Sequence, residues 1–132
     1  MSDMTIGTIS WVDLTVEDAS AIREFYRDVV GWETSDVDMG GYDDYCVHPP
    51  GRDPVAGICH ARGGNAAMPP QWLIYLTVAD LDASLERCAA RGGKVVVDPR
   101  TMGGQGRYAV IEDPAGAVAA LFQPVSRPGS SD

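Results

Sequence analysis

Two side chains in this sequence are of types that move protons or hold a polar ligand. Asp13 stands among Trp11, Val12 and Leu14, and a carboxylate between apolar neighbours has a raised pKa and can act as a general base or bind an amine or hydroxyl. His60 could transfer protons near neutral pH or hydrogen-bond a ligand. Each also has a simpler interpretation, Asp13 as a solvated or hydrogen-bonded strand carboxylate and His60 as a structural histidine. Both interpretations stay open on the sequence alone.

The three cysteines favour neither a disulfide framework nor a zinc site. Cys46, Cys59 and Cys88 are odd in number, widely spaced and without a CxxC pair. Neighbouring residues of a strand point to opposite faces, so Cys59 should point away from His60 and form no nucleophilic dyad with it. We therefore expect reduced, mainly structural thiols.

An internal repeat predicts the elements that must position these residues. A shift of 62 positions superimposes residues of the same type: Leu14, Thr15 and Val16 on Leu76, Thr77 and Val78, Asp18 on Asp80, and Gly31 on Gly93. Each copy opens with an apolar run rich in β-branched and aromatic residues, 11–16 or 72–78, which is typical of a strand. The chain is therefore expected to contain two copies of one unit.

An amphipathic helix should follow each of these strands. The first helix is expected to begin near Asp18, which can cap free N–H groups, and to end at Gly31. The second should begin near Asp80 or Asp82 and end at 92–93, where a left-handed cap needs glycine. Each helix should cover one face of a sheet.

Three further extended segments follow each helix. They are 33–38, 42–48 and 55–61 in the first copy, and 94–98, 107–112 and 117–123 in the second. The segment 113–116 has the residues of a tight turn, so the last two strands should form a hairpin. The expected fold is α+β, with two tandem βαβββ modules. Each module has a four-stranded sheet with a helix on one side.

We expect one domain over residues 1–132. Its parts are module 1 (about 7–61), a linker (62–70), module 2 (about 71–124) and a flexible tail (125–132). The uncovered sheet faces should meet around a shared cleft, within one chain or across a dimer, and a homodimer is the expected assembly.

Composition and charge exclude several classes of protein. The 132 residues are 45% hydrophobic and 22% charged, as in globular domains, and the formal net charge is −9. Few, scattered basic residues disfavour nucleic acid and anionic membranes as partners and admit neutral or cationic small molecules. Without a membrane-spanning run or a basic and apolar leader at the N-terminus, the expected location is the cytoplasm.

The chain resembles the vicinal oxygen chelate superfamily, which includes glyoxalase I, extradiol dioxygenases, methylmalonyl-CoA epimerase and bleomycin-binding proteins. The matching stretches are WVDLTVED at 11–18, FYRDVVGWE at 25–33, WLIYLTVADLDAS at 72–84, RGGKV at 91–95 and GRYAVIEDPAGAVAALFQP at 106–124. Within the superfamily the sequence is most similar to a metal-poor, glyoxalase-like branch labelled hydroxylase. The resemblance implies a glyoxalase-like fold with a small-molecule cleft.

The same resemblance implies where a metal ion would be held in metal-dependent relatives. Three of the four ligand positions fall on Trp11, Leu73 and Ala120, which cannot bind a cation, and the fourth falls on Ile58 or His60, depending on the register. One imidazole does not make a stable metal site. We therefore expect a member of the family with no metal and no other cofactor.

If the ligand positions face the cleft, strand alternation adds their neighbours to its lining. The expected ligand-binding residues are Trp11, Asp13, His60, Leu73, Tyr75, Ala120 and Phe122. Their aromatic rings would suit flat, apolar or cationic ligands, although any of them could simply belong to the core. Tyr45, His48, Arg107 and Glu112 could also reach the cleft, but alternation does not fix their facing.

The expected function is the metal-independent binding and sequestration of an aromatic or cationic small molecule, as in bleomycin-resistance proteins. The alternative is a metal-independent enzyme, an isomerase, lyase or tailoring enzyme of secondary metabolism, with Asp13 or His60 as its acid or base. A third possibility is a metalloenzyme with a rearranged ligand set such as His48, His60 and Glu112.

Overall fold

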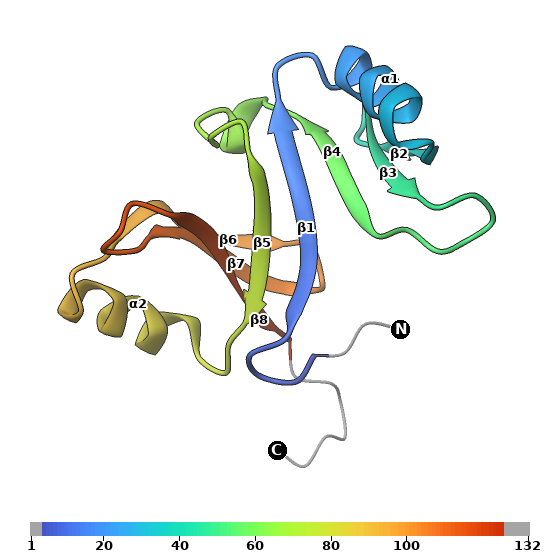
Figure 1. The fold of residues 1–132 in the computed structure, drawn as a ribbon. Coiled ribbons are helices and arrows are strands. Elements are labelled where there is room, and N and C mark those ends of the chain that lie inside the picture. Colours follow the sequence, from blue (N-terminus) through green and yellow to red (C-terminus); the bar gives the residue numbers. More distant parts are fainter. Residues whose placement is uncertain (1–3, 126–132) are drawn as a thin grey trace. The chain divides into compact units, whose positions relative to one another are not determined.

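The computed structural model describes residues 4–125 and contains the expected succession of strands and helices (Figure 1). The elements are β1 (Ile9–Val16), α1 (Ala19–Val30), β2 (Glu33–Asp38), β3 (Asp43–His48), β4 (Ala56–His60), a short 3-10 helix (Gly63–Asn65), β5 (Trp72–Thr77), α2 (Leu81–Ala90), β6 (Lys94–Met102), β7 (Gly106–Glu112) and β8 (Val118–Pro124). The α+β fold expected from the sequence is therefore confirmed, and β6 continues past its expected end. Most of the expected flexible tail and the first three residues lie outside the described residues.

The eight strands follow the hydrogen-bonded order β2-β3-β4-β1-β5-β8-β7-β6. The chain divides into two compact units. One, here called the Asp13 unit, is Trp11–Leu73; the other, the Phe122 unit, consists of the residues up to Ser10 and those from Ile74 onward.

In the Asp13 unit, helix α1 covers one face of the strands. β1 runs parallel to β4, β4 pairs antiparallel with β3, and β3 pairs antiparallel with β2. The covered face holds a buried cluster of Ala19, Tyr45, Val47, Ala56 and Ile58, against which Val12, Val16, Ile22, Tyr26, Trp32 and Trp72 pack. The opposite face carries the residues that alternate with these apolar ones.

In the Phe122 unit, helix α2 has the equivalent place. β5 runs parallel to β8, and β6, β7 and β8 form an antiparallel meander. Leu81, Ala109 and Leu121 form the buried cluster on the helix side, with Leu76, Val78, Leu85 and Ile111 packed against it. The turn between β7 and β8 is held by the Asp113 carboxylate, which accepts from the N–H groups of Ala115 and Ala117 at 2.8 and 3.0 Å.

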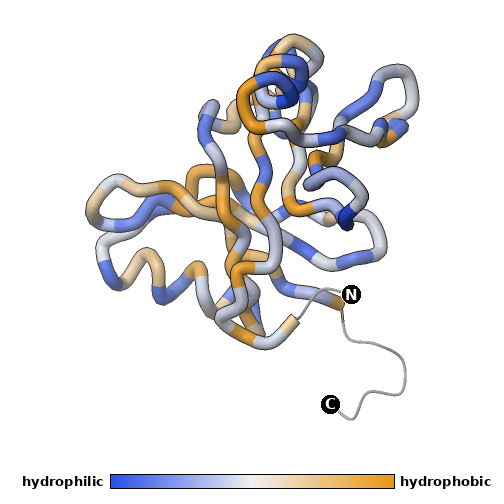
Figure 2. The backbone as a smooth tube through the Cα atoms, turned by 45° about the vertical axis from the view of Figure 1, so that its right-hand side comes forward, coloured by the Kyte–Doolittle hydropathy of each residue, from blue (hydrophilic) through white to orange (hydrophobic). Residues whose placement is uncertain are grey.

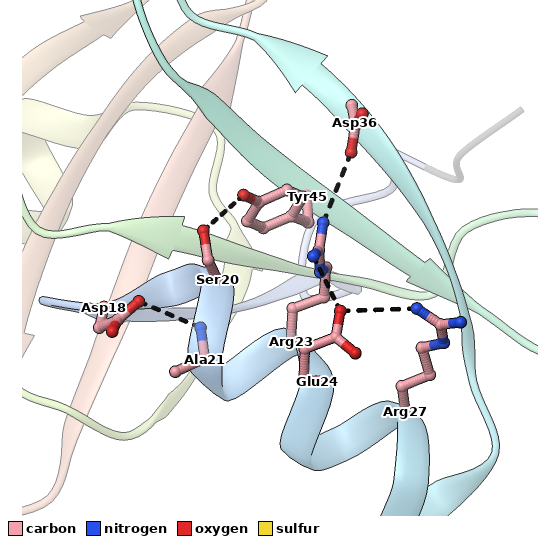
Figure 3. A network of polar contacts seen from close by, with 8 residues as sticks. All are labelled: Asp18, Ser20, Ala21, Arg23, Glu24, Arg27, Asp36 and Tyr45. Atoms are coloured by element: carbon pink, nitrogen blue, oxygen red, sulfur yellow. Dashed lines mark hydrogen bonds and ion pairs between the residues drawn. The ribbon is translucent and has the colours of Figure 1, made fainter.

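Both helices begin at the aspartates that the sequence predicts. The Asp18 carboxylate accepts from the Ala21 N–H at 3.1 Å (Figure 3), and Asp80 accepts from the Ala83 N–H at 3.2 Å. α1 ends at Gly31, which has the left-handed φ of 87° that glycine tolerates. Hydrophobic and hydrophilic residues are interleaved along both helices (Figure 2). This pattern fits helices that pack on a sheet by one side.

Among residues 4–125, no helix is long and apolar enough to cross a membrane.

Candidate functional site

The seven residues expected to bind a ligand are divided between the two units. Trp11, Asp13, His60 and Leu73 lie in the Asp13 unit, whereas Tyr75, Ala120 and Phe122 lie in the Phe122 unit. Each unit therefore carries its own set of candidate residues.

Asp13 lies on the face of its unit that α1 does not cover. It stands opposite Gly57 in the parallel β1–β4 pair, and the Trp11 indole Nε1 donates to its Oδ1 at 2.6 Å. Such a short hydrogen bond to a carboxylate fixes the orientation of both side chains. An indole and a carboxylate side by side offer a stacking surface and a negative charge to one ligand.

Gly57 provides the space that the Asp13 carboxylate occupies. A Cβ at this position would collide with Asp13 Oδ1 and would lie 3.5 Å from Trp11 Nε1. Because Gly57 has no side chain, the Asp13 carboxylate can lie against the backbone of β4. The sequence did not single out Gly57, because only the strand register shows what stands opposite it.

Two thiols share this face with Asp13. Cys46 stands opposite Gly57, and Cys59 lies two residues further along β4. Burial raises the pKa of Cys46, and the nearby charge of Asp13 raises it further. The pKa of Cys59 is raised first by burial and then by the charges of Asp13 and Asp44; a hydrogen bond to Asp44 and the neighbouring Cys46 add to the effect. Thiols with raised pKa values stay protonated near neutral pH and are poor nucleophiles and metal ligands.

The strand register places His60 on the opposite face from Asp13. His60 pairs with Val16, whereas Asp13 pairs with Gly57, so the two side chains alternate across the sheet. The imidazole ring lies edge-on to Tyr42, with centroids 5.6 Å apart, and close to Tyr45 on the helix side. The structure therefore does not bring the two acid–base candidates together, and His60 is absent from the face that carries Trp11 and Asp13.

Asp44 is the partner of His60 that the sequence reasoning missed. Its buried Oδ1 accepts from the His60 backbone N–H at 2.8 Å and lies 3.4 Å from His60 Nδ1. Because the carboxylate also hydrogen-bonds Cys59, it fastens the end of β4 to β3. Alternation with Tyr45 and Val47 places Asp44 on the face away from α1, but its contact with His60 joins two strands and has no signal in the sequence.

The residues whose facing was left open now have definite partners. Tyr45 is buried against α1, where its hydroxyl lies 2.8 Å from Ser20 Oγ and the Arg23 guanidinium stacks 4.5 Å from its ring centroid (Figure 3). Arg107 points to α2 and pairs with Asp82 at 3.1 Å. Both side chains therefore have structural contacts on the helix side of their sheets.

The rearranged metal set finds no support in the described part of the chain. His48 Nε2 lies 3.0 Å from Ser35 Oγ, His60 faces Asp44, and Glu112 lies 3.8 Å from Lys94 Nζ. Within residues 4–125, no three His, Cys, Asp or Glu side chains gather in a way that could hold a metal ion.

In the Phe122 unit, the predicted residues lie on the face away from α2. The register places Tyr75 beside Ala120, and Phe122 beside Tyr108. Tyr75, Ala120 and Phe122 are all buried, and the Tyr75 and Tyr108 ring centroids are 6.1 Å apart. Tyr75, Ala120 and Phe122 therefore share one face, as strand alternation predicted. Leu73 lies two residues before Tyr75 on β5, so its side chain points to the same face of that strand, and it is also buried.

Comparison with known proteins places this geometry in a family. Residues 8–121 match the model of the Glyoxalase/Bleomycin resistance protein/Dioxygenase superfamily. The "Putative glyoxylase CFP32" of Mycobacterium bovis is 36% identical over 124 residues, which cover 92% of this chain and 48% of that protein. The "Anthracycline biosynthesis protein DnrV" of Streptomyces peucetius is 33% identical over 135 residues, covering 93% of this chain and 49% of that protein. The chain thus spans about half the length of these curated relatives.

A crystal structure of methylmalonyl-CoA epimerase from Mycobacterium tuberculosis is similar in fold. Its TM-score is 0.55 at 21% identity, with 96% of this chain and 94% of that chain covered. At this level of identity the likeness supports the fold only.

Proposed function

Because this chain belongs to the Glyoxalase/Bleomycin resistance protein/Dioxygenase superfamily, we propose that it binds a small aromatic or cationic compound without the help of a metal ion. The observation that carries the proposal is the Asp13 carboxylate, held by the Trp11 indole on the sheet face that α1 does not cover. A net charge of −9 favours cations near such a carboxylate. Taken by itself, the row of aromatic residues in the Phe122 unit also favours a flat ligand.

The residues at the metal-ligand positions do not fit a metal ion. The Trp11 nitrogen donates its hydrogen to Asp13, and Leu73 and Ala120 carry no donor atom. A divalent ion needs three or four such donors. The proposal therefore places ligand recognition on the indole and the carboxylate.

A relative supports the class of ligand. The Streptomyces peucetius protein is named for anthracycline biosynthesis, and anthracyclines are planar aromatic compounds that carry an amine. We propose a ligand of that general chemistry for this chain, a flat ring system with a cationic group. A homodimer is the proposed assembly, and the cytoplasm is the proposed location.

9-Aminoacridine, a flat aromatic cation, tests this function. We expect it to raise the melting temperature, to be recovered unchanged, and to bind equally well with or without EDTA. Asp13→Asn keeps an acceptor for the Trp11 indole but removes the charge, so the Kd measured by calorimetry should rise about tenfold. Asp53→Asn is the matched control, because it removes one negative charge from an exposed position in the same unit and should leave the Kd unchanged.

Three outcomes would contradict the proposal. These are no binding of 9-aminoacridine by the unmodified chain, equal effects of the two substitutions, or one stoichiometric metal per purified chain by elemental analysis. Conversion of an added compound would instead favour the enzymatic alternative. Asp13→Asn and His60→Ala would then show which residue is needed for product formation while affinity is retained.

A further inference from the structure

One buried hydroxyl in the Phe122 unit lacks a hydrogen-bond partner. Thr77 is only 1% exposed, and its Oγ1 has no partner among the described residues. The Thr77 backbone, in contrast, is fully bonded: its N–H donates to the Thr8 carbonyl at 2.9 Å, and its carbonyl accepts from the Gly7 N–H at 2.8 Å. The unmet hydrogen-bonding capacity therefore belongs to the side chain.

The other buried polar atom without a partner in residues 4–125 has a local explanation. It is Nε of Arg23, whose guanidinium already contacts Glu24 at 2.8 Å, Asp36 at 3.8 Å and the Tyr45 ring (Figure 3). Leaving one N–H of this guanidinium without an acceptor costs little free energy, because the rest of the group has several partners. Thr77 has a single polar side-chain atom, so nothing compensates for it.

The register places this hydroxyl on the aromatic face of the Phe122 unit. Thr77 stands beside Phe122, which stands beside Tyr108, in one row across β5, β8 and β7. Tyr75 and Ala120 lie in the next row of the same face. On β5, β8 and β7 these rows carry no ionisable group other than the tyrosine phenols, and Arg100 of β6 stands beside Tyr108, at the far end of the row from Thr77. A neutral ligand atom therefore suits the position next to Thr77 better than an ion.

Valine has the shape of threonine and would fill this buried strand position without an unpaired hydroxyl. Burying a hydroxyl without a partner costs free energy, and almost all buried polar atoms in proteins are bonded. Thr77 Oγ1 is such an unbonded atom, and it lies on a face that is proposed to bind a ligand. Its partner is therefore expected to come from outside the polypeptide. We propose that Thr77 Oγ1 is the polar anchor of a ligand subsite, which hydrogen-bonds a hydroxyl or carbonyl oxygen on a flat aromatic compound packed on Tyr75 and Phe122. This inference rests on the proposed function and names the polar group that a ligand of the Phe122 unit must carry.

Thr77→Val, probed with 2-naphthol and 2-methylnaphthalene, tests the subsite. The two compounds differ by a hydroxyl in place of a methyl group of similar size. We expect the unmodified chain to prefer 2-naphthol roughly fivefold by calorimetry, and the variant to lose this preference through weaker binding of 2-naphthol. The variant without ligand should melt at the same temperature as the unmodified chain or higher, because it loses an unpaired hydroxyl. Thr101→Val is the matched control, because Thr101 occupies an exposed position on β6 of the same unit. It should change neither the preference for 2-naphthol nor the melting temperature.

The possible results separate this inference from the proposed function. A lower melting temperature of ligand-free Thr77→Val would show that the hydroxyl already has a partner and would overturn the inference. So would an unchanged preference for 2-naphthol in the variant, or equal or absent binding of the two naphthalenes to the unmodified chain. In each of these cases the proposed function stands if 9-aminoacridine still binds in an Asp13-dependent way, and it falls only if that binding fails.

Discussion

At the scale of single residues, Gly57 sets the position of the Asp13 carboxylate. Gly57→Ala would place a Cβ where Asp13 Oδ1 lies, so either the carboxylate or the backbone of β4 must move. We expect a loss of about 1–3 kcal/mol in the free energy of unfolding, as for other overpacked sites. Urea denaturation measures it. 9-Aminoacridine should also bind more weakly to the variant, because the pair formed by Trp11 and Asp13 is displaced.

A double-mutant cycle identifies the collision as the cause. In an Asp13→Ala background the space is empty, so Gly57→Ala should cost much less there, with an interaction energy of about 1 kcal/mol or more. Gly104→Ala is the control, because an added Cβ meets nothing there. Equal costs of Gly57→Ala in the two backgrounds would show that Asp13 does not depend on this glycine.

Strand alternation predicted part of this residue-scale picture. It placed Trp11 and Asp13 on one face, and Tyr75 with its neighbours on another. It could not place His60 relative to Asp13, because their facing depends on the register of β1 against β4, which pairs His60 with Val16. Asp44 was missed for a similar reason, since its contact with His60 joins residues of different strands.

At the scale of elements, the two helix caps make a matched prediction. Asp18→Ala and Asp80→Ala each remove the acceptor for one N–H of the first turn. We expect each to lower the free energy of unfolding by about 1 kcal/mol, while Asp18→Asn and Asp80→Asn should cost much less because asparagine also caps helices. Chemical denaturation distinguishes the two series. Equal losses for alanine and asparagine would show that charge, and not the cap, is what matters.

The elements were the most predictable part of the fold. β2 has the expected bounds, and the cap residues Asp18 and Gly31 were identified correctly, because these signals are local. The end of β6 was not predicted: the strand runs through Pro99 to Met102, with register shifts against β7. A proline usually ends a strand, but it is tolerated on an edge strand such as β6, and the sequence does not show which strand lies at an edge.

At the scale of the whole molecule, exposed apolar surface favours association of two copies, whereas net charge opposes it. Phe25 and Val29 on α1 are 53% and 64% exposed, and a second copy could cover apolar side chains of this kind. This exposed apolar surface supports the proposed homodimer.

The net charge of −9 on each copy opposes that association. Salt screens such repulsion, with a Debye length of about 30 Å at 0.01 M and about 10 Å at 0.1 M. We therefore expect light scattering to give twice the 14.1 kDa of one chain at 0.15 M salt, with a growing monomer fraction as salt is lowered toward 0.01 M at micromolar protein. Apolar burial without charge repulsion would leave the mass independent of salt, and a mass of one chain at every salt concentration would rule out the homodimer. In that last case each binding surface must lie on a single chain, so Asp13→Asn should weaken the binding of 9-aminoacridine in the monomer, and Thr77→Val that of 2-naphthol.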